Sequence, residues 1–391
     1  MRGPFWIVHS SSPTPPTLSL WRGTRAGLVF SLRIILEKDY SGPVFKEPAP
    51  SEFQLPQTSL QIPDRVDVLI VGAGPAGLAA GRRIVDAGAT VLIVDARARI
   101  GNPPRCGELA RDNFMEVFGF DPEPDWVRWR IAELGNMPVL NRSATESGAA
   151  RILSRRGASV AEGCALMGLG EYDGVGRTAR LRSSHGSMEV YARLVIAADG
   201  APSRVARLAG IDTLISPLET VSCLAYRIID TTLENANNIR FEFPPVLNPH
   251  YFWVIPSGPS EANVGLGVPA HRGHAARPLL DRLMDETGAL TGGKRIQTIV
   301  GWYPSTLPLE TPFVDGLLVT GTAARLIDAE LGEGLWQAAF SGAAAGETYV
   351  DVGERGTSAQ ELASYRDRVD RLYGPLRHGY AKRRKREARS G

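Results

Sequence analysis

Cysteine and histidine are scarce in this chain of 391 residues, which has three cysteines and six histidines. The cysteines, Cys106, Cys164 and Cys223, include no Cys-x-x-Cys pair. Their number and spacing indicate neither a disulfide framework nor a zinc or iron–sulfur centre. The histidines are scattered, with no cluster of cysteines or carboxylates around them, so no metal site is predicted. This cysteine usage favours a reducing, cytoplasmic setting.

Net charge is also small, because 44 Lys and Arg residues nearly balance 42 Asp and Glu residues, leaving a formal charge of +2. Such a chain has no general field for nucleic acid, and no nucleic-acid partner is expected. The basic surplus lies mostly in the tail that starts at Ala381, AKRRKREARSG. A terminal charge run is typical of a solvated, frayed end. Peripheral contact with the anionic inner face of a membrane is the alternative.

Sustained periodicity is missing from residues 1–64, where Pro- and Ser-rich clusters such as SSSPTPPT predict an extension of low order. The pattern changes at Arg65. RVDVLIV predicts a buried strand, PAGLAAGRRIVDAGA predicts a helix, and TVLIVDAR predicts a second buried strand. These three elements form one βαβ unit, which implies a parallel sheet.

The glycine-rich segment GAGPAG joins the first predicted strand to the helix and spans Gly72 to Gly77. In this context Gly72 permits a tight turn, Gly74 allows a pyrophosphate to approach the backbone, and Gly77 allows the helix to pack closely on the strand. Asp95 ends the second strand, where its carboxylate can accept hydrogen bonds from a ribose. The segment therefore predicts a dinucleotide site, and this fingerprint fits NAD as well as FAD.

The later part of the chain predicts two lobes. ARLVIAADG predicts a buried strand ending at Asp199, and short alternating runs between about 217 and 297 predict an antiparallel sheet over a pocket. GLLVTG then predicts another buried strand, followed by the loop GEGL and a helix. We expect a discontinuous nucleotide-binding domain (65–216 and 306–350), an antiparallel-sheet substrate domain (217–305), and a C-terminal helix with a basic tail (351–391).

Four motifs resemble those of the geranylgeranyl reductases. RCGEL at 105–109 is similar to that family's RCAEG segment, and VLNR at 139–142 is similar to its VLDR segment. YFWVIP at 251–256 resembles the YxWxFP signature, and TGTAARLIDAELGEGLWQAAFSG at 320–342 resembles the glycine-rich segment that holds the flavin. The resemblance implies an α/β fold of the p-hydroxybenzoate hydroxylase type, with a Rossmann-type FAD-binding domain on a parallel sheet and an antiparallel β-sheet substrate lobe.

The resemblance also implies a function: FAD-dependent reduction of C=C bonds in an isoprenoid (geranylgeranyl) chain. The substrate is expected to be an isoprenoid lipid or a prenyl diphosphate. The chain has no second nucleotide fingerprint and so supplies no dedicated NADPH domain. The electron donor is therefore expected to be NAD(P)H that docks transiently, or a ferredoxin. YFWVIP also resembles the WxWxIP pattern of flavin halogenases, so a flavin-dependent monooxygenase or halogenase is an alternative. A non-catalytic flavin-fold protein is another.

Fingerprint and resemblance together predict which residues surround FAD and the substrate. The predicted FAD-binding residues are Gly72, Gly74, Ala76, Gly77, Asp95, Arg105, Cys106, Gly107, Arg142, Asp199, Gly321, Thr322, Gly334 and Leu335. The predicted catalytic residues are Cys106, Tyr251 and Trp253. For Cys106 the alternative is a small residue that packs beside the flavin ring. For the two aromatic residues the alternative is a place in the sheet core.

Three positions depart from the family's pattern. Thr322 stands where the family has an aspartate that accepts a hydrogen bond from a ribityl hydroxyl, Leu109 replaces a glycine, and Ala329 replaces a proline. Losing a charged acceptor costs about 1.5–3 kcal/mol. We therefore expect FAD binding that is ~10- to 100-fold weaker than with an aspartate at position 322.

Overall fold

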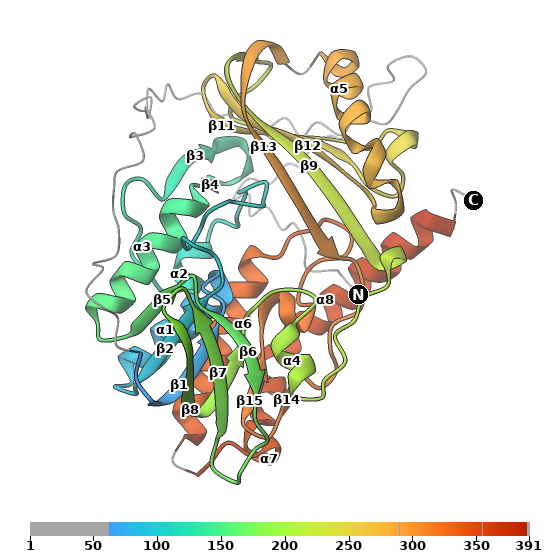
Figure 1. Cartoon of the computed structure of the whole chain (residues 1–391). Helices are drawn as coiled ribbons and strands as arrows, with labels where there is room; N and C mark the ends of the chain where they lie inside the picture. The colour runs from blue at the N-terminus through green and yellow to red at the C-terminus, as the bar shows by residue number, and fades with distance from the viewer. Residues whose placement is uncertain (1–61, 289, 354, 389–391) are drawn as a thin grey trace, which may run out of the picture.

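The computed structural model describes residues 62–288, 290–353 and 355–388, so that residues 1–61 of the predicted N-terminal extension lie outside the described residues. Two lobes make up the described chain (Figure 1). One is built on a mainly parallel sheet and is called here the parallel lobe. The other, Thr220–Pro304, is built on an antiparallel sheet and is called the antiparallel lobe.

The parallel lobe contains an eight-stranded sheet whose main path is β14-β15-β8-β1-β2-β5, with β6 and β7 added through β8. Its strands are β1 (Arg65–Val71), β2 (Val91–Asp95), β5 (Ser159–Glu162), β6 (Ala165–Leu169), β7 (Arg177–Ser183), β8 (Gly186–Ala197), β14 (Phe313–Val314) and β15 (Leu317–Val319). Strand β1 pairs in parallel with both β2 and β8, and all five residues of β2 are buried. The continuous apolar runs in the sequence reflect this burial on both faces.

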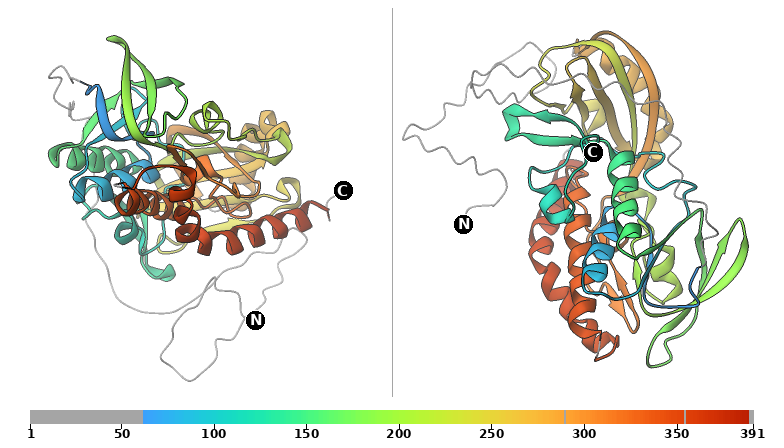
Figure 2. Two further views of the ribbon diagram at one scale, coloured as in Figure 1. Left: turned by 90° about the horizontal axis from the view of Figure 1, so that it is seen from below. Right: turned by 90° about the vertical axis from the view of Figure 1, so that its left-hand side faces the viewer.

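Helices cover the parallel sheet, and two of them pack against each other beside the glycine-rich segment. The helices of this lobe are α1 (Pro75–Asp86), α2 (Phe114–Phe118), α3 (Arg142–Arg155), α4 (Arg204–Leu208), α6 (Leu335–Val352), α7 (Ala359–Leu362) and α8 (Ser364–Ala388). Figure 2 shows α1, α6 and α8 gathered together. Helices α1 and α6 are in close contact at Gly342, where a Cβ would lie only 2.0 Å from the Ala76 carbonyl oxygen. The small residues of α6 thus let this helix pack directly against α1.

The antiparallel lobe has the strand order β10-β11-β12-β9-β13. Its elements are β9 (Thr220–Leu233), β10 (Arg240–Glu242), β11 (Phe252–Gly258), β12 (Glu261–Pro269), α5 (Ala276–Thr287) and β13 (Leu290–Pro304). Helix α5 packs on one face of the sheet, over a core that includes Tyr226 and Leu266. The other face carries Ala225, Trp253 and Ile299 and packs against a hairpin of β3 (Val127–Ile131) and β4 (Met137–Leu140). This second face is the one that meets the loops of the parallel lobe.

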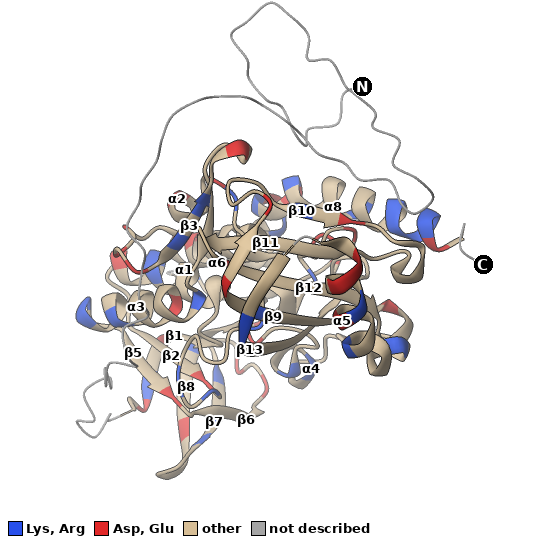
Figure 3. Ribbon diagram, turned by 90° about the horizontal axis from the view of Figure 1, so that it is seen from above, with Lys and Arg blue, Asp and Glu red and all other residues tan. Residues whose placement is uncertain are grey.

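The basic run near the C-terminus is ordered, so the expectation of a frayed end is wrong for residues 381–388. Helix α8 continues to Ala388, and its last turns gather Lys and Arg residues (Figure 3). Arg383 is only 2% exposed; it donates hydrogen bonds to the carbonyl oxygens of Ser305 and Leu218 and pairs with Glu387. The charge run therefore has one buried member that fixes α8 against the start and end of the antiparallel lobe.

His250 lies beside this helix and leads to a prediction about stability. The side chain is 2% exposed, and burial, together with the charges of Arg383 and Arg386, lowers its pKa from the ordinary 6.5 to about 3. Between these values the unfolded chain binds a proton that the folded chain does not, so the free energy of unfolding falls as the pH falls below 6.5. The expected loss approaches about 1.4 kcal/mol per pH unit.

Urea unfolding of the wild type and of a His250→Gln variant at pH 7 and pH 5 measures this contribution. The variant is expected to lose less stability than the wild type between the two values. His378, which is exposed on α8, provides the control: His378→Gln should keep the wild-type pH dependence. Equal pH dependence in the wild type and His250→Gln would contradict the assignment.

Candidate cofactor and substrate site

The glycine-rich segment follows β1 and opens α1, and its three glycines differ in what constrains them. Gly72 has φ +107°, and a Cβ there would lie 2.3 Å from the Ala198 carbonyl oxygen. A Cβ at Gly77 would lie 1.9 Å from the Gly72 carbonyl oxygen. Gly74 has an extended backbone with φ −84°, and a Cβ there would have no atom within 4 Å. The chain's own packing thus explains Gly72 and Gly77, whereas Gly74 leaves room for a ligand close to the backbone, as a pyrophosphate requires.

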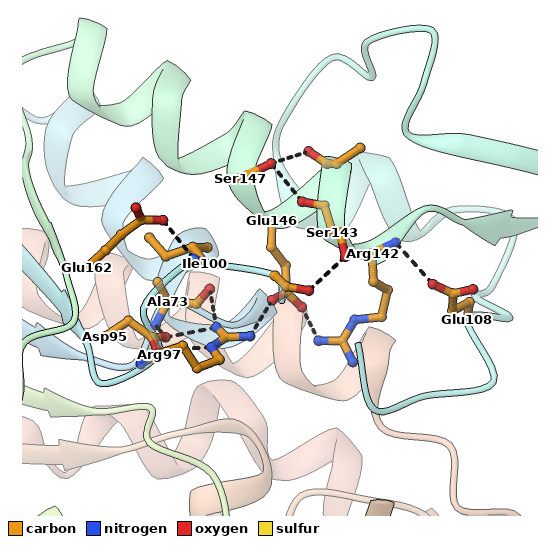
Figure 4. Close-up of polar contacts among 12 residues, drawn as sticks. Ala73, Asp95, Arg97, Ile100, Glu108, Arg142, Ser143, Glu146, Ser147 and Glu162 are labelled. Carbon is orange, nitrogen blue, oxygen red and sulfur yellow. Dashed lines mark hydrogen bonds and ion pairs between the residues drawn. The ribbon is translucent and has the colours of Figure 1, made fainter. Parts of the chain in front are cut away.

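Asp95 ends β2 and is held by more partners than the sequence indicated. Its carboxylate accepts a hydrogen bond from the Ala73 backbone N–H (2.8 Å) and contacts the Arg97 guanidinium through Nε (3.0 Å) and Nη2 (2.8 Å) (Figure 4). Burial alone would raise the pKa of Asp95, but the hydrogen bonds and charge of Arg97 and the Ala73 N–H outweigh it and lower the pKa below its usual value. The acid is therefore ionised and fixed against the fingerprint.

Arg97 begins a chain of charges that leads from Asp95 to Arg142. Its Nη1 donates to Glu146 (3.0 Å), a 1% exposed carboxylate that also pairs with Arg142 (Figure 4). Burial alone would lower the pKa of Arg142, but Glu146 and the neighbouring Cys106 raise it above its ordinary value, so Arg142 stays charged. Two predicted residues, Asp95 and Arg142, are thus connected through Arg97 and Glu146, which sequence reasoning missed. The four-residue spacing of Arg142 and Glu146 on α3 was the available signal.

The loop that contains the RCGEL motif (105–109), called here the Cys106 loop, is fixed to the antiparallel lobe by Asn263. The Trp253 indole N–H donates to Asn263 Oδ1 (2.9 Å), and Asn263 Nδ2 donates to the Cys106 carbonyl oxygen (3.3 Å). Trp253 is 8% exposed and Asn263 is 1% exposed, so both hydrogen bonds are shielded from water. A Cβ at Gly107 would lie 3.1 Å from Ile255 Cδ1, which shows how closely the loop lies against β11. The structure thus brings Cys106 and Trp253 together, and Trp253 belongs to the sheet core.

Tyr251 contacts the segment that precedes α6. Its hydroxyl donates to the Leu331 carbonyl oxygen, and its ring lies edge-on to Phe241, with 5.2 Å between the ring centroids. Burial is the main cause that raises the pKa of Tyr251 above its ordinary value, and nearby acidic groups raise it further. The hydroxyl therefore stays protonated. Tyr303, which sequence reasoning did not single out, is adjacent: a Cβ at Gly332 would lie 2.9 Å from its ring. The two tyrosines hold the loop that leads to Gly334.

The later predicted cofactor residues lie on two segments. Gly321, in a 3₁₀ turn (η5, Gly321–Ala324), has φ +61°, and a Cβ there would lie 2.8 Å from Ala76 Cβ, so this turn touches the start of α1. Thr322 is half-buried in the same turn, and Leu335 begins α6 after Gly334. Asp199, another residue predicted to bind FAD, lies on a different segment. Its carboxylate accepts hydrogen bonds from Ser203 and from the backbone N–H groups of Arg204 and Val205 at the start of α4.

Glu108 was missed by the sequence analysis although it lies within the RCGEL motif. It has φ +66°, is 1% exposed and forms an ion pair with Arg227 of β9, which is 3% exposed. Arg128 of β3 lies 3.9 Å away, measured from its Nε to Glu108 Oε2. Glu108 therefore joins the Cys106 loop to the antiparallel sheet by a buried ion pair, and its carboxylate also lies near the half-buried Arg128 of the β3–β4 hairpin. Arg105, by contrast, is exposed.

A cavity of about 670 Å³ lies where the two lobes meet. Pro202 and Ile215 come from the parallel lobe, and Cys223, Val300 and Trp302 come from β9 and β13. This volume is within the ~300–1,000 Å³ typical of small-molecule pockets.

None of the helices in the described part of the chain has both the length and the apolar character that crossing a bilayer requires.

Comparison with known proteins gives concordant results. The model of the FAD binding domain family matches residues 65–120. Digeranylgeranylglycerophospholipid reductase 2 of Methanopyrus kandleri is 31% identical over 79% of this chain and 83% of its own length. A geranylgeranyl bacteriochlorophyll reductase-like protein of Thermoplasma acidophilum superposes with a TM-score of 0.78 and 26% identity, covering 82% of this chain and 87% of the other.

A third similarity concerns the fold alone. The myxobacterial chondrochloren halogenase has a TM-score of 0.62 at 17% identity, with 80% of each chain covered. Together the matches confirm the predicted fold class and the prediction of FAD as the cofactor. The site residues predicted from the sequence stay predictions.

Proposed function

Because the chain belongs to the geranylgeranyl reductase family, we propose that it reduces C=C bonds of an isoprenoid chain carried by a polar lipid, with FAD as its redox cofactor. The observation that carries the proposal is the position of the Cys106 loop. This loop belongs to the parallel lobe and is fixed to the antiparallel sheet by Asn263. When bound and reduced, FAD would provide the hydride for one alkene carbon, and the second hydrogen would have to reach the other carbon as a proton.

The chain's own residues divide the binding of FAD among three segments. The fingerprint glycines would face the pyrophosphate, with Asp95 next to the adenosine ribose. The turn at Gly321 and Thr322 would lie along the ribityl chain, because it touches the start of α1. The backbone N–H groups at Gly334 and Leu335, at the start of α6, would place positive potential near the flavin ring. Arg142, Arg105 and Gly107 complete the predicted set.

Cys106 is the proposed proton donor because its thiol lies beside Arg142 and on the loop at the lobe interface. A Cys106→Ala variant is then expected to reduce substrate ~100-fold more slowly while keeping the flavin absorbance of the wild type. Single-turnover oxidation of the reduced holoenzyme by geranylgeranyl lipid measures this step. Cys106→Ser serves as the matched variant that keeps a donor group. Unchanged turnover in Cys106→Ala would leave only the packing role.

Tyr251 and Trp253 are proposed to shape the wall that faces the isoprenoid chain, with Trp253 acting from the sheet core through Asn263. We further propose that electrons come from NAD(P)H or a ferredoxin. The enzyme would work in the cytoplasm, in peripheral contact with the membrane that contains its lipid substrate.

A flavin-dependent monooxygenase or halogenase is the second candidate, and only the shared fold supports it. Product analysis separates the two classes. Incubation with NAD(P)H, air and halide would give an oxygenated or halogenated product from a monooxygenase or halogenase. Anaerobic incubation of the reduced holoenzyme with a geranylgeranyl lipid should instead give a product heavier by two hydrogens per bond reduced. A purified protein that takes up no FAD would favour the non-catalytic alternative.

Thr322→Asp is expected to tighten FAD binding ~10- to 100-fold, because a carboxylate accepts a stronger hydrogen bond from a ribityl hydroxyl than a threonine does. Titration of the apoprotein with FAD, followed by quenching of flavin fluorescence, measures the dissociation constant. Thr322→Asn, of similar shape but uncharged, should gain less. Weaker binding by Thr322→Asp than by the wild type would show that the turn does not lie along the ribityl chain.

A further inference from the structure

The Cys106 thiol lies beside an arginine that comes from another segment of the chain. The Arg142 guanidinium, at the start of α3, interacts with this thiol, and the Glu108 backbone N–H donates a hydrogen bond to the Cys106 sulfur (3.3 Å). The Arg142 backbone N–H in turn donates to the Glu108 carboxylate (3.4 Å). A cation beside a thiol favours the thiolate, which is the form that reacts with alkylating reagents. The position of the Arg142 guanidinium therefore governs the reactivity of Cys106.

A single carboxylate anchors the Arg142 side chain. Among the described residues Glu146 is the only acid that pairs with this guanidinium, and it lies one turn further along α3 (Figure 4). Arg142 Nε is buried and has no hydrogen-bond partner in the described part of the chain, so it provides no second anchor. Arginine has many side-chain rotamers, and fixing one of them requires a partner. Loss of Glu146 would thus free the guanidinium to leave the thiol.

Glu146 is itself fixed at both of its carboxylate oxygens. Its side chain is 2% exposed; Oε1 accepts a hydrogen bond from Arg142, and Oε2 accepts one from Arg97 Nη1 (3.0 Å). Arg97 is held by the Asp95 carboxylate through Nε (3.0 Å) and Nη2 (2.8 Å). The four charges alternate in sign from Asp95 to Arg142, so that the row ends with a positive charge next to Cys106. In such a network each member keeps its neighbour in place.

We propose that Glu146 is a positioning residue, which holds the Arg142 guanidinium against the Cys106 thiol. The inference rests on the proposed function, in which Cys106 donates a proton, and it identifies the residue that arranges the surroundings of this thiol. Glu146 acts on Cys106 through Arg142.

Two roles of Glu146 predict opposite results when its charge is removed. A negative charge near a thiol opposes the thiolate, so a purely electrostatic role predicts faster alkylation of Cys106 in a Glu146→Gln variant. The anchoring role predicts slower alkylation, because the Arg142 guanidinium is released from the thiol. The sign of the change in rate therefore distinguishes the two roles.

The test is alkylation of the full-length apoprotein by iodoacetamide at one neutral pH, with the peptide that contains Cys106 followed by mass spectrometry. Cys106 is half-buried, so the reagent has access to it. Glu146→Gln is expected to slow its alkylation about 10-fold. Glu123→Gln is the matched control, because Glu123 pairs with Arg151 of the same helix, and it should leave the rate unchanged. A rate in Glu146→Gln equal to or above that of the wild type would overturn the proposal.

A second variant covers the case in which Glu146→Gln does not fold, which circular dichroism reports. Glu146→Asp keeps the charge but shortens the side chain by one methylene group. The anchoring role predicts alkylation about 3-fold slower than in the wild type. A wild-type rate in Glu146→Asp would overturn the proposal.

A double variant tests whether Glu146 acts through Arg142. Arg142→Gln alone is expected to slow alkylation of Cys106 about 10-fold, and the addition of Glu146→Gln should slow it no further. Further slowing in the double variant would show that Glu146 acts by another route and would overturn the proposal.

Turnover separates failure of this inference from failure of the proposed function. In the FAD-loaded enzyme, Glu146→Gln is expected to lower kcat for a geranylgeranyl lipid with KM unchanged. Slower alkylation together with wild-type turnover would support the anchoring role and contradict the role of Cys106 as proton donor. Slower turnover together with wild-type alkylation would overturn the anchoring role and leave the reductase activity standing.

Discussion

Replacing Gly74 with alanine is expected to leave the apoprotein folded and to weaken FAD binding by ~10- to 100-fold. The backbone at Gly74 is extended and a Cβ there meets no atom of the chain within 4 Å, so the substitution adds neither strain nor a clash to the protein itself. The same methyl group would occupy the space in which a pyrophosphate approaches the backbone. Fluorescence titration with FAD and thermal unfolding of the apoprotein measure the two effects.

Two other glycines provide the controls for this prediction. Gly374 lies in α8, where a Cβ also has no atom within 4 Å, so Gly374→Ala should change neither FAD affinity nor folding by much. At Gly77 a Cβ would lie 1.9 Å from the Gly72 carbonyl oxygen, and Gly77→Ala should destabilise the apoprotein. If Gly74→Ala bound FAD as tightly as Gly374→Ala, the fingerprint would not approach the pyrophosphate as described.

Glu108→Gln is expected to lower the free energy of unfolding by ~3–5 kcal/mol, because it leaves the buried Arg227 guanidinium without its carboxylate. Urea unfolding at neutral pH measures the loss. Glu116→Gln, at an exposed position on α2, is the control and should change stability by less than ~0.5 kcal/mol.

A double-mutant cycle isolates the pair from the rest of the interface. The variant with both Glu108→Gln and Arg227→Gln should be less destabilised than the sum of the two single variants, since the ion pair between them is lost only once. A cost below about 1 kcal/mol for Glu108→Gln would be that of a solvent-exposed pair and would contradict the buried connection between the two lobes.

The local features of the fold could be predicted from the sequence where one pattern dictates one structure. Strand β1, the glycine-rich turn and α1 follow from apolar runs and from the glycines that the tight turn at Gly72 requires. The alternating runs between about 217 and 297 predicted the antiparallel sheet, and the resemblance added FAD. The helical end of α8 was not predicted, because the buried position of Arg383 depends on the carbonyl oxygens of Ser305 and Leu218, which are distant in the sequence.

Some of the predicted site residues lie near one another, through partners that the sequence did not indicate. Cys106 and Trp253 do lie together, but Asn263, which connects them, stands in an ordinary strand sequence that gives no sign of its role. Asp95 lies where the fingerprint predicts, yet its bonds to Arg97 and onward to Glu146 depend on how the loop after β2 meets α3. Such long-range pairs of charges are fixed by the tertiary arrangement, which the spacing within a motif does not encode.

The most direct test of the central claim is an anaerobic reaction of the purified, FAD-loaded protein. The flavin is first reduced, and its visible absorbance is lost. Addition of a geranylgeranyl lipid is predicted to restore this absorbance and to yield a lipid heavier by two hydrogens for each flavin reoxidised. Flavin that stays reduced in the presence of the lipid, or that is reoxidised with no gain of hydrogen by the lipid, would contradict the account.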